Sequence, residues 1–327
     1  MIVTATTVVL FVLGFLTLCL AIYGGRVALD IRSNLRGSTD QWYVAEQKYY
    51  LLAMIGLVVL IGRILAVPLY FWMLQSLVPY CPGAMCAYGV VNVSLPFSAI
   101  AVGLKVLLPA AYGFWIVTEL SNREAPSLPF MGWLASAFLV VLLPCVIIDS
   151  TMDVLTVAAI RPVLAPCCSS VYDVNPPFSP SAILGPEIGV IILACTVVLS
   201  LLLVPLQFVE QTTRIGRATL AALAIIAGGL YLIALHDTYA PLVLGLSSHH
   251  CPYCLFQEFP DTALFSALFW VGVVGVLWRV GVETLWIRHG MSLAPIDSLR
   301  RWLRELSAVT LLFSVVSVVS HVVLALM

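Results

Sequence analysis

The sequence predicts an all-α, polytopic integral membrane protein, built as a helical bundle of about eight transmembrane helices. Hydrophobic residues make up 62% of the 327 residues and charged residues only 9%, and the mean hydropathy is +1.08. A soluble domain has roughly 25% charged residues, so this chain cannot form a soluble surface. Its apolar residues occur in runs long enough to cross a hydrocarbon core of about 30 Å. Because loops and open sheet edges cannot face lipid, these runs are expected to be helices.

Eight apolar segments account for the predicted helices. We place them at residues 2–23, 50–78, 97–119, 130–149, 186–207, 218–235, 262–286 and 303–326. The first segment lacks the basic start and small-residue cleavage site of a secretory signal, so we expect it to remain as a membrane helix. The longest connections run only a few tens of residues, which leaves no room for a soluble domain, and no convincing internal repeat is visible. The sequence therefore predicts a single transmembrane domain over residues 1–327.

Basic residues predict the orientation of these helices, because they are enriched in cytoplasmic loops. Most basic residues follow the first, third, fifth or seventh segment or lie at the start of the eighth. They are Arg26, Arg32, Arg36, Lys48, Arg123, Arg214, Arg217, Arg288, Arg300, Arg301 and Arg304. The opposite side has Arg161 alone. Both termini are therefore expected to be exoplasmic, together with loops at 79–96, 150–185 and 236–261. We expect a multi-pass protein of the cell inner membrane in contact with the lipid bilayer. Without a basic tail, no nucleic-acid partner is indicated.

Each predicted exoplasmic loop has one pair of cysteines. The pairs are Cys81 with Cys86, Cys167 with Cys168, and Cys251 with Cys254. Single cysteines inside helices act as small apolar side chains, and these are Cys19, Cys145 and Cys195. Exoplasmic compartments are oxidising, so one interpretation of the pairs is three structural disulfides. Adjacent cysteines rarely reach disulfide geometry with each other. We therefore expect Cys167 or Cys168 to lie within disulfide range of a cysteine from another loop.

The stretch HHCPYC at residues 249–254 favours a second interpretation, thiol redox chemistry. In a C-x-x-C pair, one thiolate attacks a disulfide and the second cysteine resolves the mixed disulfide. We assign the attacking role to Cys251 and the resolving role to Cys254, with a protonated His249 or His250 favouring the thiolate. The other candidate catalytic residues are Cys81 and Cys86 as a second pair, and Cys167 and Cys168 as the link between the pairs.

The same stretch permits a third interpretation, a metal site. Imidazole and thiolate side chains together are suited to zinc or copper. The candidate ligands are His236, His249, His250, Cys251 and Cys254, with His321 as a further one. Acidic residues expected on the same face would attract a cation, and they are Asp149, Asp153, Asp173, Glu187, Asp237, Glu258 and Asp261. Covalent c-type haem requires C-x-x-C-H, and Leu255 occupies the histidine position, so no such haem is expected.

Two basic residues lie deep inside predicted membrane helices, away from the helix ends. Arg63 is about halfway along the second segment, and Lys105 lies within the third. A charge facing lipid costs roughly 3 kcal/mol or more, so each side chain should point into the bundle and have a partner. For Arg63, a structural salt bridge and a bound anion, quinone carbonyl or propionate are the open alternatives, and both residues are candidate cofactor-binding residues. A transporter would be favoured by a buried polar path of several carboxylates across the bundle, and the sequence offers few such residues mid-membrane.

The second and third segments contain these cations and flank the exoplasmic pair Cys81 and Cys86. This layout is similar to that of the membrane thiol oxidases, namely the bacterial disulfide-generating quinone reductases and vitamin K epoxide reductase. The similarity is one of layout and includes no extended motif. It implies an integral membrane thiol–disulfide oxidoreductase that exchanges electrons between an exoplasmic thiol protein and a quinone. The alternative is a non-catalytic membrane subunit of a respiratory or transport complex. In that case the loop cysteines would form structural disulfides or bind a metal.

Overall fold

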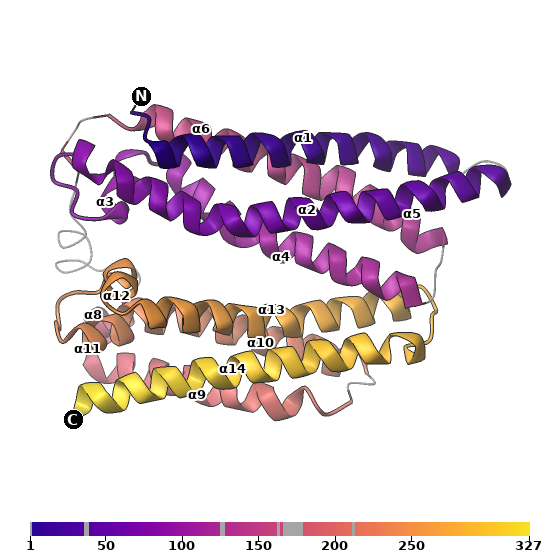
Figure 1. The fold of residues 1–327 in the computed structure, drawn as a ribbon. Coiled ribbons are helices and arrows are strands. Elements are labelled where there is room, and N and C mark those ends of the chain that lie inside the picture. Colours follow the sequence, from indigo (N-terminus) through magenta and orange to yellow (C-terminus); the bar gives the residue numbers. More distant parts are fainter. Residues whose placement is uncertain (1, 36–38, 125–127, 162–163, 166–178, 211–212) are drawn as a thin grey trace. The chain divides into compact units, whose positions relative to one another are not determined.

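The protein is all-helical in the part of the chain that its computed structural model describes, namely residues 2–35, 39–124, 128–161, 164–165, 179–210 and 213–327. No strand occurs among these residues. Eight helices in this part are long and apolar enough to cross a membrane, which confirms the predicted polytopic helical bundle. The chain separates into two compact units, Met1–Cys167 (unit 1) and Cys168–Met327 (unit 2), each with four of these helices (Figure 1).

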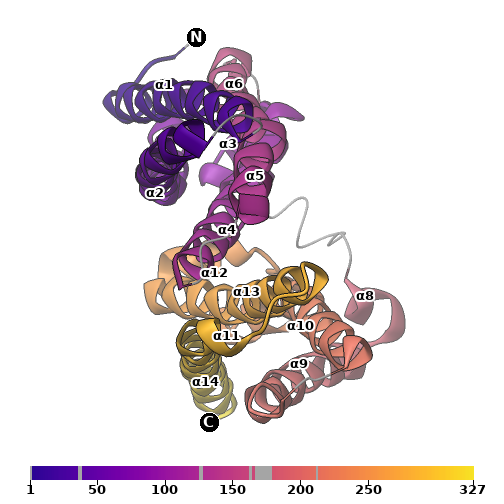
Figure 2. The same ribbon diagram turned by 90° about the vertical axis from the view of Figure 1, so that its right-hand side faces the viewer.

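Unit 1 is a bundle of four long helical stretches. The first three are α1 (Ala5–Asn34), α2 (Thr39–Leu77) and α4 (Phe97–Glu124). The fourth is formed by α5 (Leu128–Ala137), a π-helical segment (Phe138–Leu142) and α6 (Leu143–Ala159). A 3-10 turn (Val78–Tyr80) and α3 (Ala87–Val93) connect α2 with α4. Both α1 and α4 pack against α2 and α6, so the interior of the unit lies between these four helices (Figure 2).

Unit 2 has the same kind of construction. Its long stretches are α9 (Pro186–Leu206), α10 (Arg214–Ala234), α13 (Pro260–Arg288) and α14 (Asp297–Leu326). The shorter elements are α8 (Pro180–Leu184), a π-helical segment (Leu235–Tyr239), α11 (Ala240–Leu244), α12 (Pro252–Glu258) and a 3-10 turn (Ala294–Ile296). α10 packs against α9 and α13, and α14 packs against the same two helices.

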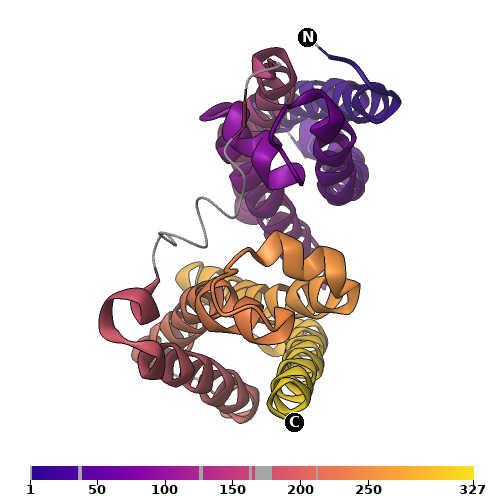
Figure 3. The same ribbon diagram turned by 90° about the vertical axis from the view of Figure 1, so that its left-hand side faces the viewer.

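The two units have a similar order of helices, although the amino-acid sequence shows no repeat. In each unit, a short helix of 7 residues, α3 or α12, lies between the second and third long helices. A cysteine directly precedes each short helix, Cys86 before α3 and Cys251 before α12. Figure 3 views unit 1 from the end at which α3 lies. The units therefore present cysteine pairs at corresponding points of the chain path.

Several helices extend beyond the predicted apolar segments. α6 reaches Ala159, so residues 150–159, which were expected in an exoplasmic loop, are helical. Polar side chains in this stretch have partners that leave the helix intact. The Thr151 hydroxyl donates to the carbonyl of Ile147 at 2.7 Å, and Asp153 accepts hydrogen bonds from another helix. A polar residue therefore ended the apolar run in the sequence without ending the helix.

The predicted orientation leads to a labelling test. Cys254 is half-buried at α12, whereas Cys19 and Cys195 are exposed on membrane-spanning helices, where lipid would cover them. We expect a membrane-impermeant maleimide, added from the exoplasmic side after reduction, to modify Cys254 and to leave Cys19 and Cys195 unmodified. Mass spectrometry of the labelled peptides measures this, with Cys254→Ser as the control. Modification of Cys254 only from the cytoplasmic side would contradict the orientation.

Candidate functional site

The structure brings three of the predicted site residues together at the start of α12. A ring nitrogen of His249 and the sulfur atoms of Cys251 and Cys254 all lie within 4.8 Å of one another. Pro252 occupies the first turn of the helix, a position that favours a helix start, so the turn begins directly after Cys251. Residues three apart on a helix face the same side, which explains why the two thiols are close.

The loop before α12 is held by hydrogen bonds within unit 2. The Nδ1 atom of His250 lies 3.0 Å from the carbonyl oxygen of His236, in the π-helical segment. The amide of His249 donates to the carbonyl of Leu246 at 3.0 Å. In the described part of the chain, the close group includes neither His236 nor His250, although both were predicted as metal ligands. The path of the loop therefore places the imidazole of His249 beside the two thiols.

The remaining predicted histidine, His321, has different partners. Its Nε2 atom lies 2.9 Å from Oδ2 of Asp261, and its Nδ1 atom lies 2.7 Å from the hydroxyl of Tyr239. These contacts connect α14 to the start of α13 and to the π-helical segment. His321 therefore supports the packing of unit 2 at this end, and the group of close thiol and imidazole atoms does not include it.

Cys81 and Cys86 are the corresponding pair in unit 1. Both side chains are buried, and burial raises the pKa of the Cys81 thiol. Between them, Gly83 adopts a φ of +82°, and a Cβ atom there would lie 2.8 Å from the carbonyl oxygen of Ala165. This turn therefore requires glycine. A raised pKa leaves less thiolate near neutral pH, which disfavours Cys81 as an attacking thiol.

Cys167 and Cys168 lie outside the described residues, so their expected proximity to a cysteine of another loop stays a prediction. The described chain contacts the loop of Cys81 shortly before them. The amide of Ala165 donates to the carbonyl of Pro82 at 2.7 Å. This contact makes Cys81 the first cysteine to consider as a partner when the disulfides are mapped.

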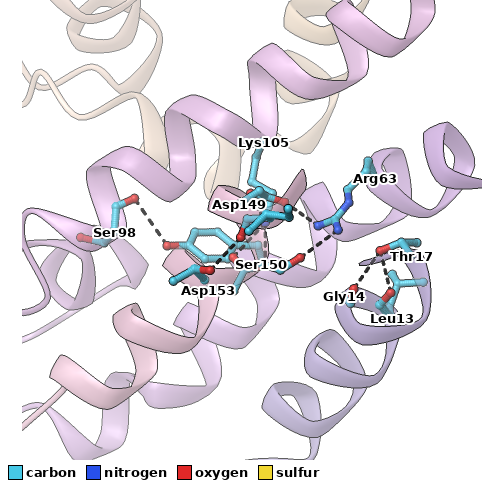
Figure 4. A network of polar contacts seen from close by, with 12 residues as sticks. Leu13, Gly14, Thr17, Arg63, Ser98, Lys105, Asp149, Ser150 and Asp153 are labelled. Carbon is cyan, nitrogen blue, oxygen red and sulfur yellow. Dashed lines mark hydrogen bonds and ion pairs between the residues drawn. The ribbon is translucent and has the colours of Figure 1, made fainter. Parts of the chain in front are cut away.

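Arg63 and Lys105 contact two aspartates in the interior of unit 1 (Figure 4). Nη1 of Arg63 donates to Oδ2 of Asp149 at 2.6 Å. Nζ of Lys105 donates to Oδ1 of Asp149 at 2.7 Å and to both carboxylate oxygens of Asp153 at 2.8 Å. All four side chains are buried. The prediction that each cation points into the bundle and has a partner is confirmed.

Further contacts support this buried charge network of Arg63, Lys105, Asp149 and Asp153. Nη2 of Arg63 donates to the hydroxyl of Ser150 at 2.9 Å. Nζ of Lys105 lies 5.2 Å from the centre of the Tyr70 ring, a distance typical of a cation–π contact. The network has no net charge when both cations and both carboxylates are ionised. Charge balance and additional hydrogen bonds are what a buried ion pair needs to offset its desolvation.

The expectation that Asp149 and Asp153 belong to an acidic exoplasmic face is wrong. Both lie on α6 with their carboxylates directed into unit 1. The two aspartates are instead buried carboxylates within a helix long and apolar enough to cross a membrane. The four-residue spacing of the aspartates places them on one helix face. That spacing was the signal available in the sequence, since two buried cations nearby required partners.

Comparison of the chain with protein-family models, with curated proteins and with solved structures finds no match. The chemistry of this protein therefore has to be argued from its own residues. Two places combine reactive or charged groups with a defined geometry. They are the group of His249, Cys251 and Cys254 in unit 2, and the buried charge network in unit 1.

Proposed function

We propose that this protein is an integral membrane thiol–disulfide oxidoreductase whose reactive pair is Cys251 and Cys254. The observation that supports the proposal is the position of both sulfur atoms and a ring nitrogen of His249 within 4.8 Å of one another. A disulfide has an S–S length of about 2.05 Å, so a small movement of the two side chains would close the bond. A base lies beside both thiols.

His249 is the proposed proton acceptor. Neutral imidazole removes the proton of one thiol, and the thiolate attacks one sulfur of a substrate disulfide while the other sulfur leaves as a thiolate. The second cysteine then attacks the mixed disulfide, so the pair is oxidised and the substrate becomes a dithiol. The reverse sequence oxidises a substrate dithiol. In that direction a quinone is the proposed acceptor, which takes up two electrons and two protons to become a hydroquinone.

Exposure favours Cys254 as the thiol that a protein partner reaches first. The side chain of Cys251 is 0% exposed, whereas that of Cys254 is half-buried. The sequence motif alone favoured Cys251 for this role. A thiol exchange reaction requires direct contact between the sulfur atoms, so access weighs more than position in the motif. Serine variants of each cysteine separate the two assignments.

The same three atoms favour a second candidate function, the binding of zinc or copper. Zn–S and Zn–N bonds of about 2.3 and 2.0 Å place tetrahedral ligand atoms roughly 3.3–3.8 Å apart. The three donor atoms here lie within 4.8 Å of one another, so small movements would bring them to that spacing. The protein would then be a membrane subunit with a metal in its exoplasmic loop.

The redox and metal states of the site distinguish the two candidates. In protein purified under air, we expect a Cys251–Cys254 disulfide that dithiothreitol opens, detected by differential alkylation and mass spectrometry. After reduction, His249→Ala should slow alkylation at neutral pH because the base is lost. The matched control is His250→Ala, which removes an adjacent imidazole outside the close group. One equivalent of zinc or copper that disappears in His249→Ala would replace the redox proposal with the metal site.

A further inference from the structure

A groove on the outer surface of unit 1 reaches the buried charge network. It lies between α1 and α6 and has a volume of about 330 Å³. The wall from α1 is apolar and includes Leu10, Phe11, Phe15 and Leu18. The wall from α6 includes Ser150 and Asp153, both members of the polar cluster around Arg63 and Lys105 (Figure 4). An apolar surface and buried polar groups therefore meet at one site.

Ser150 and Asp153 retain hydrogen-bonding capacity beyond their contacts inside the unit. Asp153 is 3% exposed and accepts two hydrogen bonds from Lys105. An ionised carboxylate has about four acceptor positions, so it can accept from a further donor. The hydroxyl oxygen of Ser150 accepts from Arg63, and a serine hydroxyl can also donate its own hydrogen. The groove thus offers one acceptor and one donor at its α6 wall.

We propose that this groove binds a lipid-soluble amphiphile with a neutral, hydroxyl-bearing head group. The tail would pack against the apolar residues of α1. A head-group hydroxyl would donate to Asp153, and a head-group oxygen would accept from Ser150. The charge balance of the network explains why the head is neutral. Arg63 and Lys105 already compensate Asp149 and Asp153, so a charged head would introduce an unpaired charge within the membrane-spanning part of unit 1.

Gly14 keeps the groove open on the α1 side. It lines the groove, and a Cβ atom built on it would meet no atom within 4 Å outside its own helix. The first carbon of a larger side chain at this position would therefore not contact a neighbouring helix, and the atoms beyond it would take up space in the groove. Gly103 on α4 has equally open space around its Cβ position and does not line the groove. Gly103, which is exposed, therefore serves as the control substitution outside the groove.

The test uses the full-length protein in lipid nanodiscs and two probes. One probe is a hydroquinone with a decyl chain, and the other is its dimethyl ether, which lacks the hydroxyl donors. Because a hydrogen bond to a charged group contributes about 1.5–3 kcal/mol, we expect the hydroquinone to bind roughly tenfold more tightly or better. Gly14→Leu should abolish saturable binding of both probes, whereas Gly103→Leu should bind them as the wild type does.

Two results would overturn the proposal. Equal affinity for the two probes would show that the groove accepts chains without recognising a head group. Wild-type binding by Gly14→Leu would show that the probes bind elsewhere. None of the residues in this test belongs to the thiol site, so the inference goes beyond the proposed oxidoreductase function. Its failure would leave the assignment of Cys251 and Cys254 unchanged.

Discussion

Serine replacement of one member of the Cys251–Cys254 pair should abolish turnover and leave a trapped mixed disulfide on the other member. The remaining thiolate can still attack a substrate disulfide, but no second thiol is present to release the adduct. Because Cys254 is the more exposed thiol, Cys251→Ser should accumulate the adduct through Cys254 faster than Cys254→Ser accumulates it through Cys251. Mass spectrometry of unreduced, alkylated protein from intact membranes measures both adducts.

The stability of the same variants separates a reactive pair from a structural disulfide. A C-x-x-C disulfide closes a very small ring, so the loop-entropy term predicts a small cost when it is lost. Both variants should therefore remain folded and inserted in the membrane. The control is Cys195→Ser, which removes a lone cysteine on α9 and should change neither turnover nor adducts. Misfolded serine variants without an adduct would identify the pair as a structural crosslink.

The helical bundle was predictable because hydropathy depends on local composition. Low charge and long apolar runs identify membrane helices without knowledge of which helix packs against which. The ends of the helices were less predictable. At α6, Asp153 and Thr151 interrupt the apolar run, yet Asp153 accepts from Lys105 and the Thr151 hydroxyl donates to the Ile147 carbonyl of the same helix. Whether a polar residue ends a helix depends on partners that a linear pattern does not contain.

The candidate site was predictable only where it is local in the sequence. Cys251 and Cys254 are close because one helical turn joins them, and the motif itself contains this information. The choice of His249 over His250 depends on the loop path, which the sequence does not give. Asp149, in contrast, lies 86 residues after Arg63. Their pairing depends on how the helices of unit 1 pack, and the sequence does not show this packing.

The largest loss of stability is expected when Asp149 is replaced by alanine. Its carboxylate is buried and accepts from Arg63 at 2.6 Å and from Lys105 at 2.7 Å. Without it, two buried cations share the single carboxylate of Asp153. Removing one partner of a buried ion pair costs about 3–5 kcal/mol, because the charge left behind is neither solvated nor compensated. Denaturant or thermal unfolding in one defined lipid measures the loss.

An exposed ion pair of the same length is the control for this prediction. Lys48 and Asp30 are 2.7 Å apart, but the Asp30 side chain is 57% exposed. Water and ions screen such a pair, so Asp30→Ala should lower the free energy of unfolding by about 1 kcal/mol or less. The loss of stability in Asp149→Asn should lie between the losses in the two alanine variants. The amide keeps the shape of the side chain and a hydrogen-bond acceptor but removes the charge. A loss in Asp149→Ala no larger than in Asp30→Ala would contradict an ionised network at Arg63 and Lys105. At a similar distance between the charged atoms, the comparison therefore contrasts a buried carboxylate that has two cationic partners with an exposed carboxylate that has one.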